Sequence, residues 1–156
     1  MSRSTRLSTA AHIMMYLAWN EGDRVRIDDI AKSASANPSR LRQLCSLLSQ
    51  AGFIRSFKGA RGGIELAIPP DKICLYDLCL AIDDLNFFAL IPHEANAECP
   101  IGATIGKILD QLYTDYNNIF TEYLRQTTVM DLLEMSNEAN ALTPSDAQTV
   151  QNRAHV

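Results

Sequence analysis

Apolar positions recur with a helical period through the first part of the chain. Residues 7–17 carry apolar side chains three and four positions apart, which predicts an amphipathic helix. A second short helix is predicted over residues 27–34, and a third begins after Asn37, a good N-cap followed by Pro38. Gly52 ends this third helix. Its buried stripe is predicted to consist of Leu41, Leu44, Cys45 and Leu48.

The period then changes to that of short strands. Residues 53–57 and 64–68 have strand-like patterns, and the segment Lys58-Gly59-Ala60-Arg61-Gly62-Gly63 between them predicts a glycine-rich hairpin. Three helices followed by a hairpin describe a winged helix-turn-helix. We therefore expect a mostly α fold with a small β-hairpin wing, in which residues 1–70 form the DNA-binding domain.

The second half is predicted to contain a helix over residues 75–84, an irregular loop over 86–100, a long helix over 101–125 and a short one over 129–135. Residues 71–135 would then hold a sensor loop and dimerisation helices. Residues 136–156 are polar and aperiodic, and we expect them to be a disordered tail.

The long predicted helix has an apolar face that requires a cover. This face consists of Ile105, Ile108, Leu112, Tyr116, Ile119 and Tyr123. A helix of about 25 residues spans roughly 37 Å, which is more than one small winged domain covers. A second copy of the chain is the expected cover, which predicts a homodimer. The alternative is a helix packed entirely on its own chain.

The formal net charge of −4 conceals an uneven distribution. Residues 1–70 hold ten Lys and Arg against five Asp and Glu, a net of +5, whereas the rest of the chain has a net of −9. This split favours a polyanion as the partner of the first half. No apolar run approaches the roughly 18 residues of a membrane span, so no membrane partner is expected. Four cysteines without a CxxC pair favour a reduced, cytoplasmic protein.

The third helix presents side chains that suit nucleic-acid bases and phosphates. Its buried stripe rotates Ser39, Arg40, Arg42 and Gln43 outward. Arginine pairs with guanine through two hydrogen bonds, and glutamine pairs with adenine. Arg61 at the hairpin tip is suited to a minor groove, and Arg6 to a phosphate contact. The alternative is a solvated polar face beside a hairpin that only reverses the chain.

Three segments resemble the Rrf-two-type family of bacterial transcription regulators. They are Asn37-Pro38-Ser39-Arg40-Leu41, Gly59-Ala60-Arg61-Gly62-Gly63-Ile64-Glu65-Leu66 and Cys99-Pro100-Ile101-Gly102. The resemblance implies a homodimer on a pseudo-palindromic duplex, with the third helix in the major groove and the wing arginine in the minor groove. The candidate DNA-binding residues are Arg6, Asn37, Ser39, Arg40, Arg42, Gln43, Lys58, Arg61 and Gly62.

The sequence differs from the cluster-binding members of this family at the sensor loop. Those members carry three cysteines there, whereas residues 86–100 contain only Cys99. An iron–sulfur cluster needs about four protein ligands, so neither a cofactor nor a metal site is expected. A cluster-responsive regulator is kept as an alternative.

Cys99 and His93 are the candidate sensor residues. Cys99 comes just before a predicted helix start, whose dipole would stabilise a thiolate, although Glu94 and Glu98 oppose it. An incidental loop cysteine is the alternative. Cys74 is expected at an N-cap with a lowered pKa. Cys45 and Cys79 are expected in the core.

The expected function is that of a sequence-specific DNA-binding repressor, controlled by an oxidant, an electrophile or a small ligand near Cys99. The alternative is a winged-helix protein-interaction module that does not bind DNA. No enzyme is expected, because the sequence has no nucleotide fingerprint, nucleophile elbow or metal-spaced His/Cys set. The pair Asp83-Asp84 is interpreted as surface charge.

Overall fold

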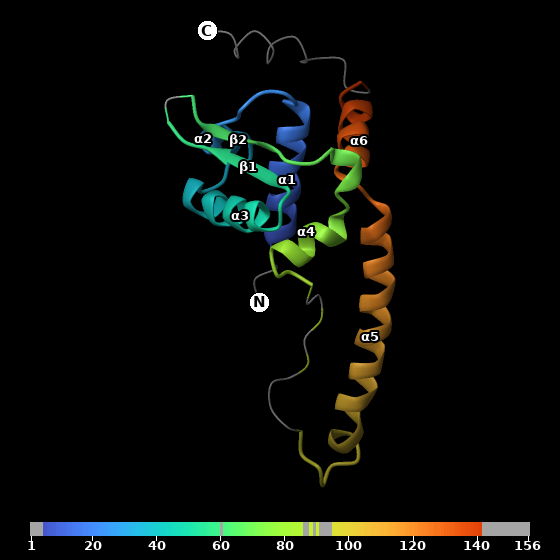
Figure 1. Cartoon of the computed structure of the whole chain (residues 1–156). Coiled ribbons are helices and arrows are strands. Elements are labelled where there is room, and N and C mark those ends of the chain that lie inside the picture. The colour runs from blue at the N-terminus through green and yellow to red at the C-terminus, as the bar shows by residue number, and fades with distance from the viewer. Residues whose placement is uncertain (1–4, 60, 86–87, 89, 91–94, 142–156) are drawn as a thin grey trace.

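Three helices and a hairpin form the N-terminal unit. The computed structural model describes residues 5–59, 61–85, 88, 90 and 95–141. The elements of this unit are α1 (Arg6–Trp19), α2 (Ile27–Ser33), α3 (Pro38–Gln50), β1 (Ile54–Phe57) and β2 (Gly63–Leu66). In Figure 1 they lie together on one side of the molecule. This arrangement confirms the predicted winged helix-turn-helix.

The start and the rotation of α3 follow from its sequence. Oδ1 of Asn37 accepts a hydrogen bond of 2.8 Å from the backbone N–H of Ser39, and Pro38 occupies the first helical position. Gly52, just beyond the helix, has a φ of +83°, a conformation that costs glycine little. The predicted stripe is confirmed as buried, with Leu41, Leu44, Cys45 and Leu48 at 3% exposure or less.

The hairpin is attached to the helices by one additional backbone pairing. β1 and β2 are antiparallel, with Ile54 opposite Leu66 and Phe57 opposite Gly63. Val25, between α1 and α2, exchanges two hydrogen bonds with Ile64, of 2.9 and 2.8 Å. This pairing fixes the base of the wing against the helices.

The second half begins against the winged-helix unit and then leaves it. Its elements are η1 (Pro70–Lys72), α4 (Leu75–Ala81), α5 (Gly102–Gln126) and α6 (Val129–Ala141). In Figure 1, α6 lies beside α1, and α5 projects away from the rest of the molecule. A short backbone bridge joins the start of α4 to the junction of α5 and α6, because Leu75 N–H donates to the carbonyl of Thr127 at 2.9 Å and Val129 N–H donates to that of Ile73 at 2.9 Å.

The structure corrects two predicted helix ends. The helix predicted to reach residue 84 ends at Ala81, because Asp83 has a φ of +53° and Asp84 N–H turns back to the carbonyl of Cys79. The tail predicted from residue 136 is wrong for residues 136–141, which continue α6. Alanine and glutamate favour a helix there even without an apolar stripe. Residues 142–156 lie outside the described residues.

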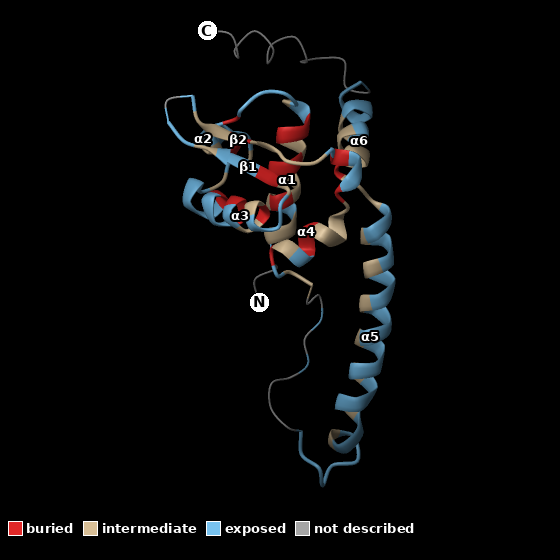
Figure 2. Ribbon diagram, viewed as in Figure 1, coloured by how far each residue is buried: buried red, intermediate tan, exposed pale blue. Residues whose placement is uncertain are grey.

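Burial is concentrated in the winged-helix unit and beside α4. Figure 2 shows the buried residues there, whereas α5 is exposed or half-buried along its described length. The largest fully buried side chains include Ile13, Met14 and Leu48 of the winged unit and Ile73 and Val129 of the bridge. The core therefore supports the α3 surface and the wing, and α5 is left with little cover.

Candidate nucleic-acid interface

The outer face of α3 is polar and opposite to its buried stripe. Ser39, Arg40, Arg42 and Gln43 are all exposed, as their helical positions predict. Ser46 continues this face one turn later and is also exposed. The face therefore offers hydroxyl, amide and guanidinium groups along several turns of one helix, which suits contacts with base edges and phosphates.

Two arginines of α3 are held by neighbouring elements. Nη2 of Arg42 donates to Oδ1 of Asp28 in α2 at 2.7 Å. Nη2 of Arg40 donates to the hydroxyl of Thr5, just before α1, at 2.6 Å. The two side chains thus lean toward opposite flanks of α3, and the centre of its outer face is left to Ser39 and Gln43. Neither partner can be predicted from the sequence, because each contact joins two different elements.

The tip of the wing is a tight turn that depends on glycine. Gly62 N–H donates to Gly59 at 2.9 Å, and Gly59 has a φ of +94°. A Cβ on Gly62 would lie 2.5 Å from the carbonyl oxygen of Phe57. Lys58 and Arg61 are exposed on this turn. Gly62 therefore shapes the turn, and the two cations extend from it.

Arg24 lies at the base of the wing and was not among the predicted site residues. Its guanidinium lies 3.7 Å from the ring centroid of Phe57, and its Nε lies 3.8 Å from Oε2 of Glu65. Arg24 thereby covers one side of the hairpin. The only sequence signal would have been a basic residue directly before Val25.

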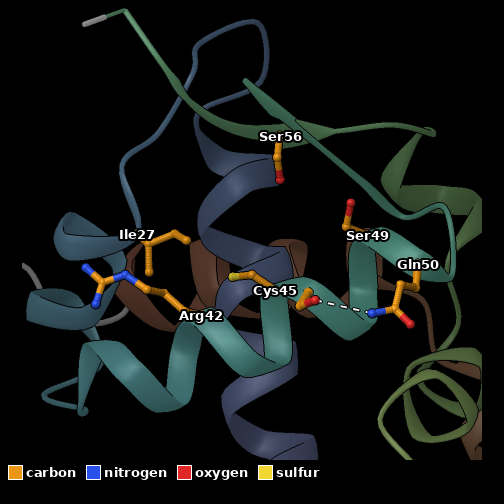
Figure 3. Close-up of a pocket in the computed structure, with 7 residues that line it drawn as sticks. Ile27, Arg42, Cys45, Ser49, Gln50 and Ser56 are labelled. Atoms are coloured by element: carbon orange, nitrogen blue, oxygen red, sulfur yellow. Dashed lines mark hydrogen bonds between the residues drawn. The ribbon is translucent and has the colours of Figure 1, made fainter. Parts of the chain in front are cut away.

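A hollow of about 360 Å³ lies between α3 and β1. Its lining consists of Ile27, Arg42, Cys45, Ser46, Ser49, Gln50 and Ser56. Figure 3 shows Ser56 of β1 and Ser49 of α3 pointing toward one another across it. Ser49, Gln50 and Ser56 were not among the predicted site residues, because their proximity depends on how β1 packs on α3.

Arg6 was expected to contact a DNA phosphate, but its side chain is engaged within the protein. Its half-buried guanidinium donates to the carbonyl of Ile82, just beyond α4. Nearby, Oδ2 of Asp84 accepts a 3.2 Å hydrogen bond from the N–H of Leu7. Asp84 is therefore not only surface charge, since it satisfies a backbone N–H at the start of α1. These two contacts join α1 to the end of α4.

Most of the apolar face of α5 remains uncovered within one chain. Ile108, Leu112, Tyr116, Ile119 and Tyr123 are between 39% and 69% exposed. Ile105, the first residue of the predicted seam, is half-buried. This exposure contradicts the alternative in which the helix packs entirely on its own chain.

One flank of α5 carries aromatic contacts with the chain segment before it. The ring of Phe88 stacks on that of Tyr113, with 5.2 Å between centroids. The guanidinium carbon of Arg125 lies 3.6 Å from the ring centroid of Tyr76 in α4. The ring of Phe88 also lies 5.7 Å from that of Tyr116, at the edge of the apolar face, and the rest of that face is left free for another partner.

Comparison with known proteins agrees with this architecture. Residues 3–135 match the family described as "Rrf2: Iron-dependent Transcriptional regulator". The chain belongs to the Rrf2 family. It is 26% identical over 123 residues to the HTH-type transcriptional regulator NsrR of Bacillus licheniformis, covering 76% of this chain and 85% of that protein.

Solved structures give the same result for the Rrf2 fold. CymR (YrzC), the global cysteine regulator of B. subtilis, aligns with a TM-score of 0.65 and 26% identity over 86% of this chain and 98% of that one. IscR of T. potens aligns with a TM-score of 0.68 and 24% identity, covering 89% and 90% of the two chains, and shows the likeness of fold. The chain is thus a winged-helix, DNA-binding transcription regulator of the Rrf2 family.

Cys99 of this Rrf2 protein lies exposed at the start of α5. Backbone N–H groups of Gly102 and Ile101 donate hydrogen bonds to the sulfur and lower the pKa of the Cys99 thiol. This lowered pKa agrees with the predicted effect of the helix start on the thiol. The other candidate sensor residue, His93, lies outside the described residues.

The remaining cysteines have raised pKa values. Burial raises the pKa of both Cys45 and Cys79 to about 11, as expected for core thiols. The lowered pKa expected for Cys74 is wrong. Cys74 does precede α4 as an N-cap, but partial burial and the neighbouring Asp77 carboxylate raise its pKa, and Sγ donates to Oδ2 of Asp77 at 3.0 Å.

The Rrf2 family is described as iron-dependent, and an iron–sulfur cluster needs about four protein ligands. Within the described part of the chain, no three His, Cys, Asp or Glu side chains gather as metal ligands. Cys45 and Cys79 are protonated core thiols, and Cys74 is engaged with Asp77. The described residues of one chain do not fit a cluster.

No described helix combines the length and hydropathy needed to cross a membrane.

Proposed function

We propose that the chain acts in the cytoplasm as a homodimeric repressor that binds a pseudo-palindromic DNA duplex. In each copy, α3 enters the major groove and Arg61 of the wing enters the adjacent minor groove. The observation that carries the proposal is the exposed polar face of α3 beside an arginine-tipped, glycine-built wing. The net charge of +5 over residues 1–70 supports it, since an anionic duplex would meet this half of the molecule.

The bare apolar face of α5 supports the dimer. Side chains as large as Ile119 and Tyr123, at 56% and 69% exposure, lie on a helix whose own chain leaves them uncovered. Pairing α5 with the same helix of a second copy would bury them and relate the two α3 helices by a two-fold axis. A two-fold axis in the protein calls for two related half-sites in the duplex.

Control through Cys99 is the third part of the proposal. An exposed thiol with a lowered pKa has a larger thiolate fraction at neutral pH and reacts faster with oxidants and electrophiles. Because Cys99 lies at the start of α5, its modification would act on the helix that sets the spacing of the two winged units. The effector is therefore expected to be an oxidant, an electrophile or a small thiol-binding ligand.

A selection from a random-sequence duplex pool tests DNA binding. The selected duplex should bind with an affinity that falls steeply with salt, by about 0.9 log unit per contacted phosphate for each log unit of salt. Replacing Arg40, Arg42 and Arg61 together with alanine should weaken binding by at least roughly a hundred-fold. Lys107→Ala, on the exposed surface of α5, is the control and should bind like the unaltered protein.

Two results would overturn the proposal. One is the absence of salt-dependent duplex binding by the unaltered protein. The other is full affinity in the triple arginine variant, which would remove α3 and the wing as the binding surface and favour a protein-interaction module.

A further inference from the structure

The hollow between α3 and β1 has a polar lining with one cation at its edge. Hydroxyl groups of Ser46, Ser49 and Ser56 and the amide of Gln50 line it together with Arg42. Among the described residues that line it there is no Asp or Glu. The amide nitrogen of Gln50 donates to the hydroxyl of Ser46 at 3.2 Å, so these two groups are already oriented together.

The position of the hollow matters for how a duplex would lie on this surface. The major and minor grooves of a duplex are separated by one sugar–phosphate strand. If α3 occupies the major groove and Arg61 the neighbouring minor groove, that strand must pass between them. The hollow lies between α3 and β1, the strand that leads into the wing (Figure 3). The crossing strand would therefore lie over it.

The chemistry of the lining suits a phosphodiester. Hydroxyl and amide groups donate hydrogen bonds to phosphate oxygens, and such contacts position a protein on DNA without selecting a sequence. Ser49 and Ser56 approach from two different elements, as Figure 3 shows, so they would hold a phosphate from opposite sides. Arg42 lies at the rim, and its guanidinium, which Asp28 holds in the free protein, would turn from that carboxylate to the phosphate.

The hollow is less suited to a small apolar effector. Ligand pockets are usually enclosed and lined mainly by apolar side chains. Here only Ile27 and the buried Cys45 are apolar, against three serines, a glutamine and an arginine. The lining therefore favours an anion with several oxygen acceptors.

We propose that this hollow is a binding site for one backbone phosphate of duplex DNA, held by Ser49, Ser56 and Gln50 with Arg42 at its rim. This inference rests on the proposed function and adds residues that neither the sequence nor the family comparison assigns. It makes β1, and not only the wing tip, part of the DNA-binding surface.

The test compares variants on the duplex selected by the unaltered protein. Ser49→Ala with Ser56→Ala should lower the affinity about ten-fold, and by the same factor on a duplex of unrelated sequence, because phosphate contacts carry no sequence information. Ser56→Thr keeps a hydroxyl in a strand and should retain the affinity. Ser136→Ala in α6 is the matched control and should change nothing.

Duplexes with single methylphosphonate substitutions locate the contact. At one backbone position the neutral substitution should weaken the unaltered protein about ten-fold and have no further effect on the double serine variant. Gln50→Glu should weaken binding more than the serine changes, because it places a carboxylate beside that phosphate. Asn118→Asp adds the same charge on α5 and should have little effect.

The outcomes separate this inference from the function on which it rests. If the unaltered protein binds duplex but the double serine variant binds equally well, the phosphate site is wrong and DNA binding stands. If the variant's loss adds to that of the methylphosphonate at every position, the site is also wrong. If the unaltered protein binds no duplex, both proposals are overturned. Thermal unfolding of each variant shows whether the fold is preserved.

Discussion

Arg42 of α3 donates a hydrogen bond to Asp28 of α2 across 2.7 Å, so a carboxylate lies beside a guanidinium that faces the proposed DNA surface. The two side chains are 55% and 63% exposed. An ion pair as exposed as this contributes up to about 1 kcal/mol to stability. A phosphate or a guanine could therefore replace Asp28 as the partner of Arg42 at little cost. Asp28 therefore orients Arg42 in the free protein and would compete for it with a bound duplex.

Asp28→Asn should tighten binding to duplex DNA at low salt by about two- to five-fold, because it removes a competing negative charge. Fluorescence anisotropy titrations over a series of salt concentrations would measure the change. Asp29→Asn is the matched control, since Asp29 is the next residue and pairs with Lys32 at 3.7 Å. Weaker binding by Asp28→Asn would show that Asp28 acts mainly by positioning Arg42.

Ile119→Glu should separate the proposed dimer. It places a charge in the centre of the exposed apolar face of α5, which would raise the dissociation constant of the dimer by at least roughly a hundred-fold. Sedimentation velocity over a range of concentrations measures this constant. Asn118→Glu introduces the same charge at the neighbouring exposed position and should remain dimeric. Equal dissociation of both variants would argue against this face as the interface.

Cys99 should be alkylated at lower pH than the same cysteine in the unfolded chain. Its pKa is lowered in the folded protein, so the thiolate fraction at neutral pH rises on folding. Cys45 and Cys79, with pKa values near 11 and buried side chains, should remain unmodified. The pH dependence of iodoacetamide labelling, followed for each cysteine by mass spectrometry, checks both statements. An unchanged midpoint for Cys99 on unfolding would contradict the first.

Gly102→Ala should raise the pKa of Cys99 back toward its ordinary value. A Cβ on Gly102 would lie 2.2 Å from the carbonyl oxygen of Asn96, so the turn before α5 must shift and its N–H groups leave the sulfur. Gly106→Ala is the control, because a Cβ there meets open space. It should stabilise α5 by about 1 kcal/mol and leave the labelling profile of Cys99 unchanged. The same labelling profile in both variants would show that the turn is dispensable.

The surface of α3 could be predicted from sequence because one apolar stripe fixes the rotation of a helix. With Leu41, Leu44 and Leu48 inside, Ser39 and Gln43 have to face outward. The N-cap was predictable for the same kind of reason, since Asn37 and Pro38 act on their own neighbours along the chain.

Contacts between distant segments could not be predicted in this way. The charge of Arg6 predicts a DNA contact, and only the packing of α1 on the end of α4 shows that its guanidinium donates to the carbonyl of Ile82. The pKa of Cys74 was misjudged because an N-cap position suggests a lowered value, whereas burial and Asp77 dominate. Ser56 was missed because its relation to α3 exists only after β1 has packed.

The bridge between residues 73–75 and 127–129 has a consequence for how the family can vary. Leu75 and Val129 connect the start of α4 to the junction of α5 and α6 through their main-chain N–H groups, so these two hydrogen bonds depend on no side chain, although the buried Val129 must remain apolar. A change of side chain at the half-buried Leu75 therefore leaves the long helix α5 connected to α4. Only an imino acid at either donor would remove one of these two bonds outright.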